Sequence, residues 1–99
     1  MALLKNIEIN NSGVIVEYWR IARAIVEFAS NANEGADDRV EILVHGYKSK
    51  QDRDSGKNYV VARTINYTAS QIGGVEQISR PGLYASLKSD PDFHDAENI

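Results

Sequence analysis

The sequence of 99 residues contains no cysteine, which excludes a disulfide scaffold and any metal site built on thiolates. It also lacks a long hydrophobic run. A membrane-spanning helix needs roughly 18 to 20 apolar residues, and the longest apolar-rich segment, residues 14–28, is interrupted by Glu17, Arg20, Arg23 and Glu27. The opening MALLKNIEIN has no long apolar centre and no cleavage site of small residues. We therefore expect no secretory signal peptide, and a protein that is intracellular when it is made.

Positive charge is not concentrated anywhere along the chain. Eleven lysines and arginines are spread among fourteen aspartates and glutamates, which gives a formal net charge of −3. A nucleic-acid surface needs clustered basic residues that displace counterions, so we expect neither nucleic acid nor a membrane as partner. With 42% apolar and 25% charged residues, the composition is that of an ordinary globular protein. We expect one domain over residues 1–99.

Residues 14–28, VIVEYWRIARAIVEF, decide the fold class. A helix over 14–29 would pair Arg23 with Glu27 one turn apart and would align most of the large apolar side chains on one face. A strand needs a change of phase near Tyr18 and Trp19, which a β-bulge supplies. The strand would carry two apolar sets on opposite faces, Val14, Val16 and Tyr18 on one and Trp19, Ile21 and Ile25 on the other.

The residue types in this segment favour the strand. Most are β-branched or aromatic, and such side chains lose rotamer freedom in a helix and pack well on a pleated sheet. The preceding NNSG, residues 10–13, is a turn cluster. No capping box opens a helix there, because Ser12 is followed three residues later by Ile15. We therefore predict a mainly antiparallel β fold, with an α+β fold containing a helix at 14–29 as the alternative.

Three more strands surround this one in the prediction. A short apolar run over residues 3–9 precedes the turn, and residues 39–50 follow an exposed loop at 30–38 and are expected to pair with 14–28 as a long hairpin. Residues 51–58 are expected to form a second turn. The strand predicted over 59–68 would place four apolar side chains on one face, Tyr59, Val61, Ile65 and Tyr67. The sequence thus predicts about four strands in a meander.

The C-terminal third changes character. Residues 69–79 contain Gly73 and Gly74 and are expected to form a loop or irregular crossing, whereas residues 80–90 predict one short helix that begins near Pro81. Leu83, Tyr84 and Leu87 lie at helical spacing within it. Residues 90–99 hold four acids and no base. They form either a flexible acidic tail or a segment docked through Phe93 and Ile99.

Two acidic segments contain the ligand types of metal sites. Residues 52–56, DRDSG, resemble the opening of a calcium loop, but an EF-hand would need glutamate at position 63, which is Arg63. The tail holds the densest set, without a closing glycine turn: Asp90, Asp92, His94, Asp95 and Glu97. We interpret the first segment as a polar turn and the second as a solvated tail. We expect no metal and no cofactor.

Catalytic signatures are equally weak. His45 as a general base would need a nucleophile, and Ser49 lacks the Gly-x-Ser-x-Gly context of a nucleophile elbow. The aromatic residues would make a stacking platform only with basic residues interleaved among them, so core packing and cross-strand pairing explain them better. That set is Tyr18, Trp19, Tyr47, Tyr59 and Tyr67. We predict that the protein is not an enzyme.

Three segments, YWRI (18–21), GYKSKQDRDSG (46–56) and LYASLKSDPDF (83–93), are the most distinctive in the chain. Through them, and over nearly its whole length, the chain resembles a group of small proteins encoded among the late structural genes of tailed bacteriophages and prophages. None of the segments is a catalytic signature. The resemblance implies a virion or tail component without an established active site. It also implies a place in the virion or, during assembly, in the cytoplasm of the bacterial host.

We therefore expect a non-enzymatic phage structural protein that self-associates, or docks on a neighbouring phage subunit, through an apolar strand face or an unpaired edge strand. Both faces of the predicted sheet are apolar, which favours a homo-oligomer in which a second subunit covers one of them. The alternative is a transient assembly chaperone or accessory binding protein that is absent from the mature particle. The residues expected at the interface are Trp19, Ile21, Val44 and Tyr47, with Leu83 and Leu87 anchoring the helix.

Overall fold

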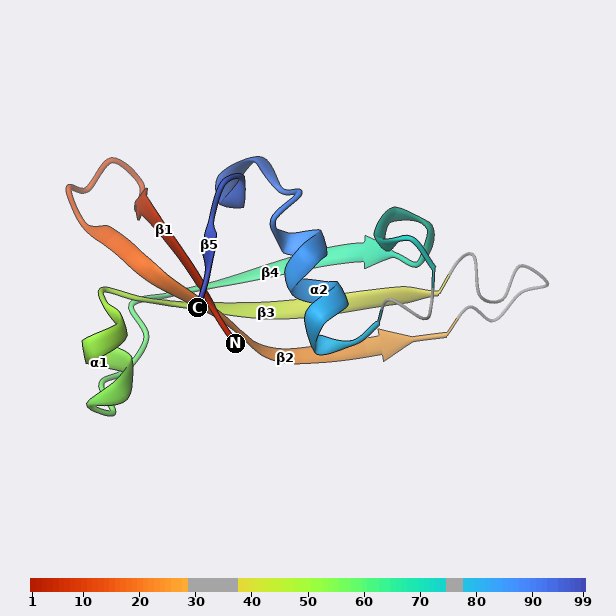
Figure 1. Cartoon of the computed structure of the whole chain (residues 1–99), viewed down its shortest axis with the longest axis horizontal. Coiled ribbons are helices and arrows are strands. Elements are labelled where there is room, and N and C mark those ends of the chain that lie inside the picture. Colours follow the sequence, from red (N-terminus) through yellow and green to blue (C-terminus); the bar gives the residue numbers. More distant parts are fainter. Residues whose placement is uncertain (29–37, 75–77) are drawn as a thin grey trace.

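The computed structural model describes residues 1–28, 38–74 and 78–99. Its main feature is a five-stranded antiparallel sheet in the order β4-β3-β2-β1-β5 (Figure 1). The strands are β1 (Leu3–Glu8), β2 (Ile15–Glu27), β3 (Arg39–Tyr47), β4 (Val61–Thr68) and β5 (Glu97–Asn98). The helices are α1 (Lys50–Asp54), α2 (Arg80–Leu87) and two short 3-10 turns, η1 (Ser70–Ile72) and η3 (Pro91–Phe93).

The predicted mainly antiparallel β fold is confirmed, and the four predicted strands are all present. Residues 15–27 form one continuous strand, so the helix considered for 14–29 is wrong. β2 and β3 form the predicted long hairpin, from Tyr18 opposite Tyr47 to Glu27 opposite Arg39. The loop predicted at 30–38 lies, apart from Asp38, outside the described residues.

The turn between β1 and β2 follows directly from its sequence. Asn10 and Asn11 have φ of 51° and 54°, and Gly13 has φ of 82°. These left-handed conformations are tolerated by asparagine and glycine and are strained for most other residues. The NNSG cluster therefore reverses the chain at the predicted position.

β2 changes phase near Tyr18, as predicted, but the prediction that Val16 and Trp19 lie on opposite faces is wrong. Val16 and Trp19 are both fully buried although they lie three residues apart, and both face Gly46 of β3. Strict alternation would place them on opposite faces. The change of phase lies opposite the register shift that interrupts β1 between Leu4 and Ile7.

A second irregularity in β2 was not predicted. Ile21 lies opposite Val44 and Arg23 lies opposite the adjacent residue Leu43, so Ala22 is the extra residue of a bulge. The bulge moves Ile25 to the other face, where it is 48% exposed. The prediction that Ile25 shares a face with Trp19 and Ile21 is therefore wrong.

One face of the sheet is covered by α2 and the C-terminal segment (Figure 1). Ser79 caps α2 by accepting a hydrogen bond of 3.2 Å from the Gly82 N–H, and Pro81 occupies the first turn, where its missing N–H is not needed. The helix confirms the prediction for 80–90. The core joins side chains of sheet, helix and tail: Leu3, Val16, Trp19, Val40, Ile42, Val44, Ile72, Leu83, Tyr84, Leu87, Phe93 and Ala96.

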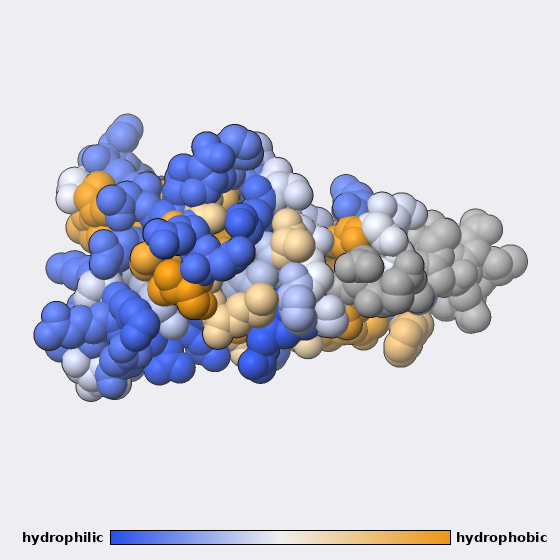
Figure 2. Space-filling model, in the orientation of Figure 1, coloured by the Kyte–Doolittle hydropathy of each residue, from blue (hydrophilic) through white to orange (hydrophobic). Residues whose placement is uncertain are grey.

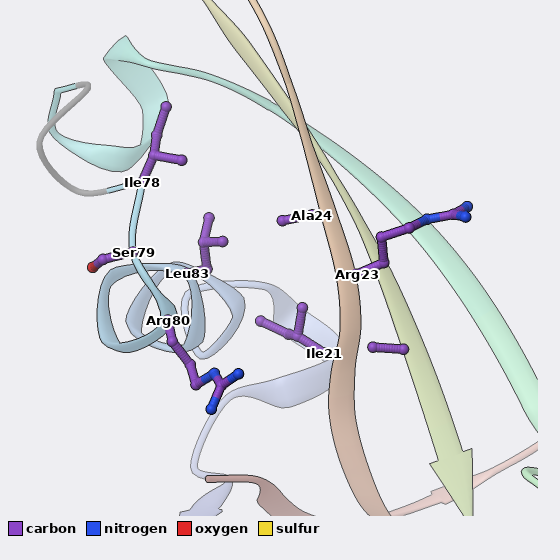
Figure 3. A pocket seen from close by; sticks show the side chains of 8 residues that line it. Ile21, Arg23, Ala24, Ile78, Ser79, Arg80 and Leu83 are labelled. Carbon is purple, nitrogen blue, oxygen red and sulfur yellow. The ribbon is translucent and has the colours of Figure 1, made fainter.

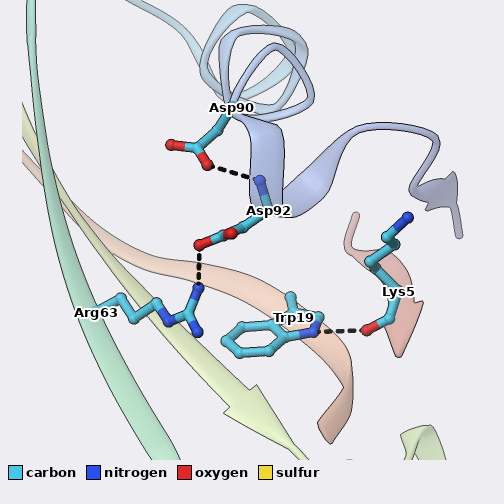
Figure 4. A network of polar contacts seen from close by, with 5 residues as sticks. All are labelled: Lys5, Trp19, Arg63, Asp90 and Asp92. Atoms are coloured by element: carbon cyan, nitrogen blue, oxygen red, sulfur yellow. Dashed lines mark hydrogen bonds and ion pairs between the residues drawn. The ribbon is translucent and has the colours of Figure 1, made fainter. Parts of the chain in front are cut away.

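Trp19 joins the N-terminal strand, the sheet and the C-terminal segment (Figure 4). Its Nε1–H donates a hydrogen bond of 2.9 Å to the Lys5 carbonyl, and its ring meets Phe93 edge-on at 5.1 Å. The Arg63 guanidinium lies 5.2 Å from the indole centre and 2.9 Å from an Asp92 carboxylate oxygen. Gly46 makes room for the indole, because a Cβ there would lie 2.7 Å from Trp19 Cζ3.

The C-terminal residues are packed onto the fold. Phe93 is fully buried, and β5 pairs with β1 at Leu3 and Leu4. Backbone hydrogen bonds of 3.0 Å also join Ala2 and Ile99 in both directions. Of the two alternatives for residues 90–99, the structure shows docking through Phe93, because its ring fills the core beside Trp19.

Two local predictions are wrong. Residues 51–58 are not a simple turn, because Lys50–Asp54 form α1, capped by the Ser49 hydroxyl, which accepts a hydrogen bond of 3.1 Å from the Asp52 N–H. Tyr59 does not share a face with the apolar residues of β4. It precedes that strand and stacks on His45 at 3.8 Å.

Candidate functional site

β2 is longer than the strand beside it. β1 pairs with β2 only between Ile15 and Trp19, whereas β3 pairs with β2 from Tyr18 to Glu27. Among the described residues, no strand pairs with the β1 side of β2 beyond Trp19 (Figure 1). We call residues 20–27 along this side the open edge of β2. It lies next to the short strand β1 and not at the outer limit of the sheet.

Backbone groups of the open edge point outward. The Ile21 N–H donates a hydrogen bond of 2.8 Å to the Tyr84 hydroxyl, so the backbone of Ile21 is turned away from its partner Val44 on β3. In an antiparallel ladder the backbone groups of successive residues turn alternately to the two sides. Ala24 lies opposite Ile42 and Val26 lies opposite Val40, two and four residues before Val44 in β3. Ala24 and Val26 therefore turn their N–H and C=O groups to the open edge.

A groove of about 320 Å³ lies along this edge (Figure 3). In the figure the side chains of Ile21 and Ala24 point toward Leu83, whereas Arg23 points to the other side of the sheet. The small side chain of Ala24 leaves space between β2 and the beginning of α2. The groove is lined by Ile21, Ala22, Arg23 and Ala24 of β2 and by Ile78, Ser79, Arg80 and Leu83.

Large apolar side chains are exposed at the end of β2. Ile25, Val26 and Phe28 are 48%, 36% and 75% exposed, and Figure 2 shows hydrophobic surface over this end of the molecule. A strand with outward backbone groups, exposed apolar side chains and an adjacent groove is a template for pairing with another chain. These features make the open edge the best candidate for a functional site.

The face of the sheet opposite α2 is mixed in character, which corrects the expectation of two apolar faces. Arg20 lies opposite His45 there, and Ile25 lies opposite Glu41. Burial, followed by the positive charges of Arg20 and Arg23, lowers the pKa of His45. This face carries enough charge to stand in water, so the need for a second subunit to cover it disappears.

Five of the six residues expected at an interface are buried inside the fold and are not free to contact a partner. Trp19, Val44 and Leu87 are fully buried, and Leu83 and Tyr47 are only 4% and 6% exposed. Trp19, Val44, Leu83 and Leu87 belong to the core that holds α2 on the sheet. Tyr47 is buried on the opposite face, beside Tyr18 and Arg53. Ile21 is half-buried, and it lines the groove beside the open edge together with Leu83.

The acidic candidates serve as caps and ion-pair partners. Asp54 forms an ion pair of 2.7 Å with Lys50, and Asp92 pairs with Arg63 at 2.9 Å. Asp90 accepts a hydrogen bond of 3.0 Å from the Asp92 N–H and so caps η3. Within the described part of the chain, no three acidic or histidine side chains gather closely enough to hold a metal ion.

The structure separates the other candidates as well. The Ser49 hydroxyl caps α1, while His45 stacks on Tyr59, so these side chains form no nucleophile and base pair in the structure. Tyr18 and Tyr47 meet edge-on at 5.9 Å, and Trp19 lies in the core on the other face. The aromatic residues are therefore divided between the two faces and make no continuous platform.

Sequence reasoning raised an unpaired edge strand in general terms but did not locate it. A signal was present, because the apolar run before the NNSG turn is much shorter than the run after it. A short strand beside a long one leaves part of the long one unpaired.

Comparison of the chain with family models, curated proteins and solved structures finds no match. No helix in the described ranges is long and apolar enough to span a bilayer.

Proposed function

We propose that the protein is a non-enzymatic structural protein that assembles with copies of itself by adding a neighbour's strand to the open edge of β2. The observation that carries the proposal is the coincidence of outward backbone groups, exposed apolar side chains and a groove at this edge. Strand addition derives affinity from backbone hydrogen bonds and specificity from pockets for alternate side chains. It requires no cofactor, metal or nucleic acid.

The proposed setting is a phage or prophage particle, in its tail, with assembly in the cytoplasm of the bacterial host. We base this setting on the resemblance of YWRI (18–21), GYKSKQDRDSG (46–56) and LYASLKSDPDF (83–93) to small late structural proteins of tailed phages. A small domain buries a limited fraction of its surface, so contacts between subunits add to its stability. The open edge offers such a contact without unfolding any part of the core.

The test is the solution mass measured by size-exclusion chromatography with light scattering across a dilution series. We expect a multiple of the 11.0 kDa chain mass that falls on dilution. Ala24→Pro removes an outward N–H from the open edge without removing a bond to β3, and it should shift the protein to the monomer. Thr64→Pro is the matched control, because the same alternation turns the backbone of Thr64 to the outer edge of β4.

Each outcome has a defined meaning. Loss of the oligomer in Ala24→Pro but not in Thr64→Pro, with circular dichroism unchanged, supports the open edge as the assembly surface. The reverse pattern would assign assembly to β4 and overturn the proposal. A monomer at every concentration would overturn self-association. Mass spectrometry of purified particles tests the setting, since absence of the protein from them would favour an assembly chaperone.

A further inference from the structure

The last residues of the open edge carry charges that would pair with those of an identical segment running antiparallel to them. Residues 23–27 read Arg-Ala-Ile-Val-Glu. Arg23, Ile25 and Glu27 lie on the face opposite α2, since they follow one another in strict alternation after the bulge. Arg23 and Glu27 are exposed, and neither forms an ion pair within the described ranges. Two such segments running antiparallel would bring opposite charges together.

The backbone limits how two copies of the edge pair. In an antiparallel ladder, residues with outward groups on one strand lie opposite residues with outward groups on the other. Beyond the bulge at Ala22, the outward residues of the open edge are Ala24 and Val26. Two-fold registers centred on them place Ala24 opposite Ala24, Val26 opposite Val26, or Ala24 opposite Val26.

Charge selects among these registers. With Ala24 opposite Ala24, Arg23 lies opposite Ile25, and with Val26 opposite Val26, Glu27 lies opposite Ile25. Only the third register places Arg23 opposite Glu27, and the two-fold axis forms that pair twice. Opposite charges facing each other across a strand pair stabilise it, whereas like charges destabilise it. Glu27 already has Arg39 as its neighbour on β3, so the register gives it a second arginine.

Side-chain size selects the same register. On the groove side it places the larger Val26 side chain of the second copy against the small side chain of Ala24. Val26, which is 36% exposed, thereby fills space that Ala24 leaves in the groove. Leu83 lies behind them and lines the groove (Figure 3). Burial of apolar surface then adds to the backbone hydrogen bonds.

We infer that the occupant of the open edge is β2 of a second copy of this chain, antiparallel across a two-fold axis that passes between the two Ile25 residues. This inference rests on the proposed role of the open edge in assembly. The two sheets form one continuous sheet through the axis. Ala24 and Val26 exchange backbone hydrogen bonds, and Arg23 pairs with Glu27 on the face opposite α2.

Cysteine cross-linking tests the register, and the chain contains no cysteine to interfere. Directly opposite residues in a non-hydrogen-bonded pair have Cα atoms about 4.5 Å apart, within the range that a disulfide spans. Ile25→Cys should therefore form a covalent dimer rapidly with oxidised glutathione. Ile15→Cys is the matched control, because Ile15 is equally exposed on the same strand, at 46% against 48%, but lies beside β1. It should cross-link much more slowly.

Charge reversal tests the ion pairs independently. Arg23→Glu and Glu27→Arg each replace two attractive pairs with two repulsive ones and should raise the dimer dissociation constant by roughly tenfold. The double variant restores opposite charges and should recover most of the affinity. Recovery is the expected result, and additive losses in the double variant would overturn the register.

The failure of the register differs from the failure of the proposed function. Fastest cross-linking through Ala24→Cys or Val26→Cys would assign one of the other two registers and overturn this one. An oligomer that is lost in Ala24→Pro but gives no cross-link at these three positions would leave the proposed function standing with a different occupant. A wild-type protein that is monomeric at every concentration would overturn both the register and the proposed self-association.

Discussion

Tyr84, which is buried, and Tyr67, which is half-buried, provide a sharp test of how α2 is held on the sheet. The Tyr84 hydroxyl accepts a hydrogen bond of 2.8 Å from the Ile21 N–H and donates one of 3.0 Å to the Met1 carbonyl. It thus connects the helix to the bulged part of β2 and to the N-terminus. Tyr84→Phe removes both bonds and leaves a backbone donor and acceptor unpaired in a partly buried place. We expect a loss of about 1 to 3 kcal/mol in the free energy of unfolding.

Tyr67→Phe is the matched comparison. The Tyr67 hydroxyl is buried without a hydrogen-bond partner among the described residues. Its removal relieves an unpaired polar group, so we expect no loss of stability, or a gain of a few tenths to about 1 kcal/mol. Burial raises the pKa of both tyrosines. A group with a raised pKa contributes stability that is fully present below its ordinary pKa of 10.0 and is lost as the pH rises through the higher folded-state pKa. The unfolding free energies are therefore measured near pH 7.

Urea unfolding followed by tryptophan fluorescence reports both variants, since Trp19 is the single tryptophan and is buried. The slope of the transition should be unchanged, so that the midpoints carry the difference. With total stabilities of about 5 to 15 kcal/mol for such domains, the expected difference is well resolved. Equal losses in the two variants would refute the reasoning, because hydrogen bonding is what distinguishes the two hydroxyls.

Two further predictions concern β3. Gly46→Ala places a Cβ 2.7 Å from Trp19 Cζ3 and should lower the free energy of unfolding by about 1 to 3 kcal/mol; an unchanged melting temperature would contradict the close packing. The lowered pKa of His45 means that its stabilising contribution is present above its ordinary value of 6.5 and is lost as the pH falls through the folded-state value. Stability should therefore fall on acidification, and less so in His45→Gln; identical pH profiles would count against this assignment.

Much of the fold was readable from residue types and spacing. The β-branched and aromatic run at 14–28 indicated a strand because those side chains disfavour a helix. The NNSG cluster indicated the turn, because asparagine and glycine accept left-handed conformations. The spacing of Leu83, Tyr84 and Leu87 indicated the short helix. Each of these signals is local, so a single sequence carries it.

The candidate site was only partly readable. Apolar character singled out Trp19 and Val44 as interface residues, but the same character serves a core, and only packing distinguishes the two uses. The bulge at Ala22 also escaped prediction, because nothing in the local residues requires it. That bulge turns Ile25 to the exposed face and sets which side chains border the groove.

The sequence by itself determined four of the five strands, the first turn and helix α2, since these depend on neighbours along the chain. The tertiary structure decided where β1 stops against β2, which leaves residues 20–27 unpaired on that side among the described residues. It also decided that the C-terminal segment fills the core through Phe93. Both outcomes depend on contacts between residues far apart in sequence, chiefly those of Trp19 with Lys5 and Phe93. Such contacts are set by how the side chains fit together in space, and local spacing carries no record of them.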